Sequence, residues 1–552
     1  MMTLSKRKWR YPIFLSLLLV GLIAASQLQD KYFKLNKNLE IFVGILKELD
    51  LYYVEDINPD VIVKIGIDAM LGALDPYTSF LPEEDLENFK TFTTGEYGGI
   101  GAIIGTRKGK NMVMMLYKDC PAHQGGLRVG DEIVQINGEE MKDKPLPHIS
   151  SLLKGMPGTS VQVAVARYGI KKPVEVTLTR EQVTLKNVPY YGQLQPGIGY
   201  IRLANFAMHA TDEVRAALES LKESGVQTLI LDLRGNPGGI LEEAIGVVNL
   251  FIDQDLPVVA TKSKVAALTK SYPTTQPAYD KAMPVIALID QKSASAAEIV
   301  AGVLQDYDRG VLIGKSTFGK GLVQTTRPLS YNTQLKLTTS KYYIPSGRSI
   351  QKIDYSRQRQ EKVIEETAEV PKKVFKTKAG RKVYDGNGIA PDIEAEKLSV
   401  APITLSLLEK GLIFDYAVVF QVQHAHIQSA KDFVLSNKEY ERFVAWLKDK
   451  DYAYTIEPRI EQLLQQAQGE AYTADIQKQI TSLKNQVQRQ KAADLQKFKA
   501  EIKLLLQEAI IMGYYFQEGA IEAMLPHDQA VQKACALFKD MPQYDQLLKA
   551  TM

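Results

Sequence analysis

Apolar residues near the start of the chain recur at the spacing of one helix face. The repeating positions are Leu39, Phe42, Val43, Leu46 and Leu49, and the pattern continues at Val61, Ile65 and Met70. A turn at residues 74–77 interrupts it. Two or three helices are too few to bury a core of their own, so we expect residues 29–92 to pack on a later domain or on another subunit.

The pattern changes near residue 93, where glycines begin to separate short apolar runs. The expected strands are 112–117, 132–136, 160–167 and 173–179, with short helices near 122–127 and 148–153. The pair Asn137-Gly138 is a strong turn signal. Residues 93–182 are therefore predicted to form a small β-rich module.

Strands and helices alternate over residues 183–397, which indicates an α/β core. One buried strand is expected at 228–233 and another at 285–289, and each leads through a turn of small residues into a helix. Residues 322–343 are predicted to form a hairpin. Residues 353–383 are dense in charge and are predicted to form an exposed excursion.

The rest of the chain, residues 398–552, is predicted to be helical. Residues 461–506 are rich in Gln, Lys and Leu, which suits either a long amphipathic helix or a helical hairpin. We expect this region to serve packing or dimerisation.

The N-terminus combines basic residues with a short apolar run. The basic residues that precede the apolar run 13–25 are Lys6, Arg7, Lys8 and Arg10. This pattern is typical of an export signal, and an uncleaved membrane anchor is the alternative. In either case, residues 1–28 are expected to place the rest of the chain in the periplasm or another extracytoplasmic space.

Composition excludes several classes of function. The chain has 552 residues, too many for one hydrophobic core, and its formal net charge of +3 gives no field to attract nucleic acid. Its two cysteines, Cys120 and Cys535, build no disulfide framework, although a single bridge between them stays open. The six histidines form no metal-ligand motif, so we expect no metal and no cofactor.

Ser295 is the candidate nucleophile. It opens the helix that follows the strand at 285–289, and Glu298 completes a capping-box pattern, so a simple helix cap is the alternative interpretation. The neighbouring alanines leave space for a substrate backbone. The N–H groups at a helix N-terminus also suit a developing oxyanion.

Lys320, between two glycines, is the candidate general base. If it begins the apolar strand, then Lys320, Leu322 and Gln324 face one side, and Lys320 and Gln324 meet in one pocket. A desolvated lysine loses affinity for its proton and acts as a base at neutral pH. No Ser-His-Asp set is evident, because His209 is interpreted as structural, so a Ser-Lys pair is the available route.

Gly238 and Gly239 follow the strand at 228–233, where glycines let the backbone approach a ligand closely. An N–H group of Gly238 or Gly239 is expected to pair with that of Ala296 as the oxyanion hole. A nucleotide-binding loop is the competing interpretation, but the sequence has neither GxGxxG nor a phosphate-binding loop here.

Four segments of the chain resemble carboxyl-terminal-processing (tail-specific) serine peptidases. They are DLRGNPGG at 232–239, SASAAE at 293–298, TFGKGLVQ at 317–324 and YIPSGRSI at 343–350. In that family the base lysine lies about two dozen residues after the nucleophile and the glutamine about four after the lysine, which selects Ser295 over Ser293 and includes Gln324. The resemblance implies a crotonase-like (ClpP-like) α/β peptidase core at 183–397, with an inserted domain and helical N- and C-terminal regions.

Residues 93–182 resemble a PDZ domain. Its carboxylate-binding loop is matched by Tyr97 followed by Gly98, Gly99, Ile100 and Gly101. Loop N–H groups of this kind hold a terminal carboxylate, and the next strand accepts the peptide as an added strand. The resemblance implies that this domain senses the C-terminus of a substrate, and a PDZ domain used only for packing is the alternative.

Together these features predict an extracytoplasmic serine endopeptidase that acts on proteins with accessible, non-polar C-termini. Its expected partners are those substrates, further copies of the chain in a homo-oligomer, an adaptor or activator, and the inner membrane if the N-terminus is an anchor. Two other classes compete: an inactive PDZ scaffold that binds protein C-termini, and a structural protein of the cell envelope. The presence of Ser295 and Lys320 argues against both.

Overall fold

The computed structural model describes most of the chain and divides it into two units. The described residues are 32–355, 373–395, 400–454, 456–470 and 474–550. The first unit comprises residues 1–80 with Leu335–Leu337, and the second comprises 81–334 and 338–552. The expected signal or anchor at 1–28 lies outside the described residues, as does part of the predicted excursion at 353–383. Within the described ranges, no helix is both long and apolar enough to cross a bilayer.

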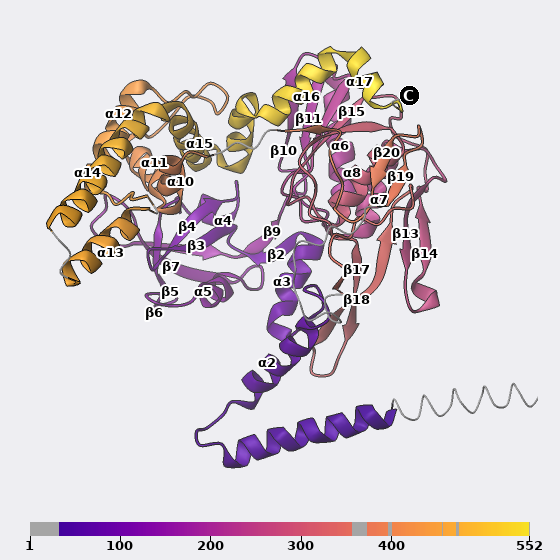
Figure 1. The fold of residues 1–552 in the computed structure, drawn as a ribbon, viewed down its shortest axis with the longest axis horizontal. Coiled ribbons are helices and arrows are strands. Elements are labelled where there is room, and N and C mark those ends of the chain that lie inside the picture. The colour runs from indigo at the N-terminus through magenta and orange to yellow at the C-terminus, as the bar shows by residue number, and fades with distance from the viewer. Residues whose placement is uncertain (1–31, 356–372, 396–399, 455, 471–473, 551–552) are drawn as a thin grey trace, which may run out of the picture. The chain divides into compact units, whose positions relative to one another are not determined.

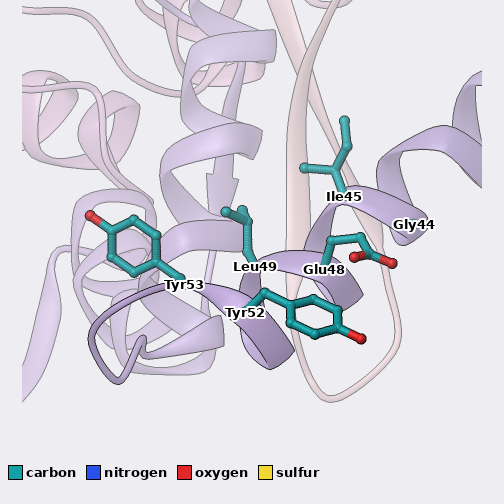
Figure 2. Close-up of a pocket in the computed structure, with 6 residues that line it drawn as sticks. All are labelled: Gly44, Ile45, Glu48, Leu49, Tyr52 and Tyr53. Carbon is teal, nitrogen blue, oxygen red and sulfur yellow. The ribbon is translucent and has the colours of Figure 1, made fainter.

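The described part of the first unit is mainly helical, as expected. A helix over 32–52 precedes α2 (Pro59–Gly72), which begins after its N-cap Asn58, and β1 (Ser79–Leu81) lies at the end of the unit. Figure 2 shows a shallow concave surface on the first helix, lined by Gly44, Ile45, Glu48, Leu49, Tyr52 and Tyr53. Tyr52 is 76% exposed, so this surface carries apolar side chains in contact with solvent.

A β-rich module follows α3 (Glu83–Thr94) in the second unit. Its main sheet has the order β3-β4-β5-β7-β8, with β6 beside β5, and β2 pairs separately with β9. The elements are β2 (Glu96–Gly99), β3 (Ala102–Arg107), β4 (Lys110–Leu116), α4 (Pro121–Gln124), β5 (Glu132–Ile136), β6 (Glu139–Glu140), α5 (Leu146–Leu153), β7 (Ser160–Ala166), β8 (Val174–Thr179) and β9 (Glu181–Thr184). The expected strands and short helices are confirmed, and β3 lies at the edge of the sheet.

The α/β core is built on a second sheet of six strands, ordered β10-β11-β12-β15-β16-β21. The strands are β10 (Tyr190–Gln195), β11 (Ile198–Arg202), β12 (Thr228–Asp232), β15 (Val285–Ile289), β16 (Gly310–Gly314) and β21 (Ile393–Glu394). They run parallel except for β10, which is antiparallel to β11. In β12, Leu229 and Leu231 face one apolar cluster and Ile230 faces the other. This burial on both faces explains why the strand appears in the sequence as one apolar run.

Helices cover both faces of this sheet (Figure 1). One face is covered by α6 (Ala210–Glu223), α7 (Leu241–Asn249) and α8 (Ala296–Asp306). The other is covered by α16 (Gln529–Lys539) and α17 (Met541–Leu547), the last helices of the chain. Tyr544 of α17 also donates its hydroxyl hydrogen to the carbonyl oxygen of Val285 in β15, at 3.1 Å. The C-terminal helices are therefore packed onto the α/β core.

A further sheet holds the expected hairpin. It contains β13 (Pro257–Lys262), β14 (Lys270–Pro273), β17 (Leu322–Pro328) and β18 (Gln334–Tyr343), and the short pair β19 (Val374–Lys376) and β20 (Lys382–Tyr384) lies later in the chain. The predicted hairpin at 322–343 is thus confirmed as β17 and β18.

The remaining C-terminal residues form helices, of which α11 and α15 contact the β-rich module. They are α10 (Pro402–Glu409), α11 (Leu412–Gln423), α12 (Asn437–Trp446), α13 (Ile456–Gly469), α14 (Ala474–Lys497) and α15 (Lys499–Met524). Because α13 packs against α14, the helical hairpin is the correct one of the two alternatives for 461–506. Arg107 of β3 forms an ion pair with Asp415 of α11, at 3.0 Å. Cys120 and Cys535 are both free thiols, so the open question of a bridge is settled against one.

Candidate active site

Ser295 lies at the junction of β15 and α8, where a buried strand leads into a helix. Its backbone angles, φ 55° and ψ −113°, fall outside the regions that non-glycine residues favour. Such strained conformations cost about 1–3 kcal/mol each and cluster at functional sites. Ser293 is fully buried, and its Oγ donates to the carbonyl oxygen of Leu233 at 2.8 Å, which is a structural role. Ser295 is the partly exposed serine of the two.

Glu298, in the first turn of α8, is a fully buried carboxylate. Its Oε2 accepts hydrogen bonds from the N–H groups of Ser295, at 2.8 Å, and Lys320, at 2.9 Å. Its Oε1 accepts from the N–H group of Gly319, at 2.7 Å, and from the hydroxyl of Thr317, at 2.6 Å. One carboxylate oxygen therefore joins the main chains of the candidate nucleophile and the candidate base.

The surroundings of Glu298 also change its ionisation. Burial raises the pKa of Glu298 to about 7, although the hydrogen bonds from Thr317, Lys320, Gly319 and Ser295 act in the opposite direction. An ionised carboxylate only accepts hydrogen bonds, which suits a site where every neighbouring group is a donor. Protonation would turn one oxygen into a donor and would oppose these contacts. Near neutral pH, the two forms of Glu298 therefore support the surrounding loop to different degrees.

Lys320 lies in the loop before β17, and the expectation that it begins the strand is wrong. The strand starts at Leu322, because the N–H groups of Gly319 and Lys320 are bound to Glu298 rather than to a neighbouring strand. Gly319 has a φ of 89°, a conformation that glycine adopts without strain. The loop is thereby held at the N-terminus of α8, where Glu298 binds the main-chain N–H groups of both Lys320 and Ser295.

Gln324 lies within β17, on the strand that leaves the Lys320 loop. Its Nε2 donates to Oγ1 of Thr338 in β18, at 3.1 Å, so the amide is held across the hairpin. Alternation along the strand places Gln324 on the same face as buried Leu322. The contact that holds the Gln324 amide is thus with Thr338 of β18, and its orientation of Lys320 stays a prediction.

The glycine turn after β12 lies directly against Ser295. A methyl group added to Gly238 would come within 2.8 Å of Cβ of Ser295 and within 2.9 Å of the N atom of Ala296. The N–H group of Gly238 donates to Oδ1 of Asn236, at 2.8 Å. In this conformation the N–H group of Gly238 is bound to Asn236, which leaves Gly239 as the other of the two glycines expected from the sequence.

Gly239 offers its N–H group in a different direction. Gly239 forms a parallel bridge with Phe206. The N–H group of Phe206 donates to the carbonyl oxygen of Gly238, and the carbonyl oxygen of Phe206 accepts from the N–H group of Ile240. In such a bridge the middle residue directs its own N–H group away from its partner. The N–H group of Gly239 therefore points away from Phe206, and its role as an oxyanion donor together with that of Ala296 stays a prediction.

A buried ion network lies under the glycine turn, and the sequence analysis did not identify it. Asp232 is fully buried and pairs with Arg202, at 2.9 Å, and Arg234, at 2.6 Å, while the hydroxyl of Tyr200 donates to it at 2.7 Å. Burial opposes ionisation, but the two arginines hold the pKa of Asp232 well below its usual range. Arg234 also pairs with Asp528, the N-cap of α16, at 2.7 Å. The C-terminal helices thus support the turn that carries Gly238 and Gly239.

The expected carboxylate-binding loop of the β-rich module is shorter in the structure than in the sequence pattern. Gly98 and Gly99 belong to β2, where they pair with β9. Ile100, which is buried, and Gly101, with φ 73°, make the turn into β3. The turn therefore leads directly into the edge strand of the sheet.

The side of β3 that faces α5 is apolar. α5 packs beside β3, and Ala102 and Ile104 of β3 and Leu152 of α5 are partly buried against the core of the module. An edge strand beside a helix, with apolar side chains between them, is an arrangement that accepts an added peptide strand.

In the described ranges, no group of three His, Cys, Asp or Glu side chains is placed to hold a metal ion.

Comparison with known proteins identifies three similar regions. Residues 197–361 match the model of peptidase family S41, residues 112–167 match the model of a PDZ domain, and residues 403–538 match that of a probable PDZ-protease C-terminal helical domain. A carboxy-terminal-processing protease of Bartonella bacilliformis is 33% identical over 348 residues, which cover 62% of this chain and 79% of that relative. A carboxy-terminal processing protease of Bacillus subtilis is 32% identical, with coverage of 54% and 63%, respectively.

Two solved structures are among those similar to this chain. A photosystem II D1 C-terminal processing protease shares 27% identity over 64% of this chain and 86% of its own, with a TM-score of 0.36. The PDZ domain of a carboxy-terminal protease from Vibrio cholerae, solved in complex with a peptide, shares 27% identity over 16% of this chain and 99% of its own, with a TM-score of 0.16.

Proposed function

Because the chain belongs to the family of carboxy-terminal-processing serine proteases with a PDZ domain, we propose that it cuts peptide bonds with Ser295 as nucleophile and Lys320 as general base. The family, the fold class and the serine-protease activity predicted from the sequence are confirmed by these relatives. The residues that perform the chemistry, the recognition of non-polar C-termini and the location outside the cytoplasm are our proposals.

The proposed reaction is acyl transfer. Lys320 in its neutral form takes the proton of Ser295 Oγ as this oxygen attacks the carbonyl carbon of the scissile bond. The N–H groups of Gly239 and Ala296 stabilise the resulting oxyanion. Lys320 then gives its proton to the leaving amine, which leaves an ester on Ser295. Water, activated by Lys320, hydrolyses the ester, and Gln324 orients the lysine amine without adding charge.

One observation carries this proposal above the others. Oε2 of Glu298 accepts from the N–H groups of both Ser295 and Lys320, although these residues lie in separate elements of the fold. A helix cap alone would need only the bond to Ser295. The second bond supports a site in which nucleophile and base are held at a fixed separation.

We propose that substrates bind to the PDZ domain through their C-termini. The peptide would add as a strand to the free edge of β3, with its carboxylate at the turn formed by Ile100 and Gly101, after Gly98 and Gly99 of β2. The apolar side chains between β3 and α5 favour non-polar residues at the end of the tail. An inactive PDZ scaffold remains the alternative, and it predicts binding of tails without cleavage.

We also propose that the chain acts outside the cytoplasm. The basic and apolar pattern of residues 1–28 supports an export signal or an anchor in the inner membrane. The exposed apolar side chains of the helix at 32–52 support a homo-oligomer, and an adaptor or activator would bind alongside the substrate.

The proposal is tested with one unstructured substrate protein that is offered with two C-termini, one ending in apolar residues and one ending in aspartates. Wild type is expected to cut the apolar form about 10-fold more efficiently, mainly through a lower KM, because the PDZ domain concentrates that tail. Ser295→Ala should bind the apolar tail equally well and cut neither form. Equal cleavage of both forms would overturn the tail recognition, and tail binding without cleavage by wild type would favour the scaffold.

A further inference from the structure

A buried tyrosine contacts both the nucleophile and the base segments, although no motif of the sequence pointed to it. Tyr342 lies near the end of β18 and is 2% exposed. Its hydroxyl is 3.2 Å from the carbonyl oxygen of Ser295 and also forms a hydrogen bond to the carbonyl oxygen of Lys320. Both partners are acceptors, so the tyrosine hydroxyl donates, and its single hydrogen is shared between the two main-chain oxygens.

The contacts of Tyr342 complement those of Glu298. Glu298 binds the N–H groups of Ser295 and Lys320, whereas Tyr342 binds their carbonyl oxygens. In addition, the N–H group of Tyr342 donates to the carbonyl oxygen of Gly321, at 3.0 Å, which fixes the strand against the lysine loop. The buried side chains of Glu298 and Tyr342 therefore hold the main chains of Ser295 and Lys320, one at the N–H groups and the other at the carbonyl oxygens.

The backbone of Ser295 explains why a second contact is needed. With φ 55° and ψ −113°, Ser295 occupies a conformation that persists only when its surroundings impose it. Glu298 fixes the N–H side of the residue, and ψ determines where its carbonyl oxygen points. A donor at that oxygen therefore fixes ψ and, with it, the start of α8, including the N–H group of Ala296.

We propose that Tyr342 is a positioning residue that sets the separation and orientation of Ser295 and Lys320 through its hydroxyl group. This inference rests on the proposed Ser-Lys mechanism. The ring and the hydroxyl of Tyr342 have separate contacts. The ring packs in the apolar cluster of the α/β core, whereas the hydroxyl contacts the two carbonyl oxygens, so the proposed role is distinct from packing. Phenylalanine at this position keeps the ring and removes only the contact in question.

Tyr343 supplies a matched control. It is the next residue of β18, and alternation along a strand turns its side chain to the opposite face. Its ring lies under the ammonium group of Lys262, at 4.4 Å from the centroid, and not at the candidate site. Tyr343→Phe therefore removes the same atom from the same strand without touching Ser295 or Lys320.

The test compares Tyr342→Phe, Tyr343→Phe and wild type for kcat, KM, thermal midpoint and binding of an apolar-tailed peptide. Tyr342→Phe is expected to lower kcat about 10- to 100-fold, because misplacement of reacting groups by about 1 Å has effects of that size. Its KM and peptide binding should match those of wild type, and its thermal midpoint should fall by no more than about 5 °C, because only the hydrogen bonding of one buried hydroxyl is lost. Every property of Tyr343→Phe should match that of wild type. The rate at which a fluorophosphonate probe labels Ser295 should fall with kcat.

Two results would overturn the inference. One is a kcat of Tyr342→Phe within twofold of wild type, and the other is a loss of kcat that merely follows a lowered thermal midpoint. Ser295→Ala and Lys320→Ala, measured alongside, separate this failure from failure of the mechanism itself. If those two variants are inactive and Tyr342→Phe is fully active, only the role of Tyr342 falls. If they cleave like wild type, the Ser-Lys mechanism falls as well.

Discussion

Ser295→Ala and Lys320→Ala are each expected to lower kcat for an unstructured protein substrate by about 10³-fold or more, with little change in KM. Without Ser295 no ester forms, and without Lys320 no neutral amine takes the serine proton. The N–H groups proposed as oxyanion donors, those of Gly239 and Ala296, are unchanged in both variants, so we expect substrate binding to be retained. Because nucleophile and base act as one unit, the double variant should be no slower than either single variant.

Lys292→Ala is the matched control for these two variants. Lys292 is an exposed residue just before Ser295, on the same loop between β15 and α8, and its removal should leave kcat unchanged. All three variants should keep the thermal midpoint of wild type, since neither Ser295 nor Lys320 is part of a hydrophobic core. Cleavage by Ser295→Ala within about tenfold of wild type would contradict the assignment, provided that purification removes other proteases.

Glu298→Gln is expected to have the second largest effect, lowering kcat about 10²-fold and also lowering the thermal midpoint. The carboxylate accepts hydrogen bonds from the main chain of Ser295, Gly319 and Lys320. Glutamine offers one oxygen to these donors and points an NH₂ group at the others. A buried donor left without an acceptor costs about 1–3 kcal/mol, and the loop that carries Lys320 is free to move away.

Glu219→Gln is the control for this substitution, because Glu219 is an exposed glutamate on α6, remote from the loop. It should match wild type in both kcat and thermal midpoint. If Glu298→Gln loses thermal stability but keeps full kcat at a temperature where it is folded, the carboxylate serves the fold alone. Full retention of both properties would mean that its hydrogen bonds have no role in holding the site.

Residues whose role is local could be predicted from the sequence. The strand at 132–136 was predicted with its observed bounds, because an apolar run ends there at a strong turn. The strand at 285–289 was predicted equally well, since a strand buried on both faces is apolar throughout. Ser295 and Lys320 were selected because their spacing matches that of the family the chain resembles, and their catalytic roles stay predictions.

Residues that act through distant contacts were misread or missed. Glu298 fits a local capping box, so its bonds to Gly319 and Lys320 were not foreseen. Because these bonds hold Gly319 and Lys320 outside the sheet, β17 begins only at Leu322, and the expectation that Lys320 begins the strand is wrong. Tyr342 carries no signal of its own, because it stands in a strand of mixed polarity and only the fold shows where its hydroxyl lies.

The sequence pattern of a helix also does not show which element the helix packs against. The helices α16 and α17 were predicted only as part of a helical region, yet they cover one face of the core sheet. An amphipathic face indicates that a helix is covered but not by what. The ion pair between Asp528 and Arg234, which supports the glycine turn, depends on that packing and was therefore out of reach of sequence analysis.

The most direct test of the Ser-Lys pair is to locate the reactive serine. Wild type is treated with a fluorophosphonate probe, digested and analysed by mass spectrometry, together with Lys320→Ala and Lys292→Ala. The account predicts one labelled peptide, with the adduct on Ser295, at equal rates for wild type and Lys292→Ala and about 10²-fold more slowly for Lys320→Ala. An adduct on Ser293 or another serine, or labelling of Lys320→Ala at the wild-type rate, would contradict it.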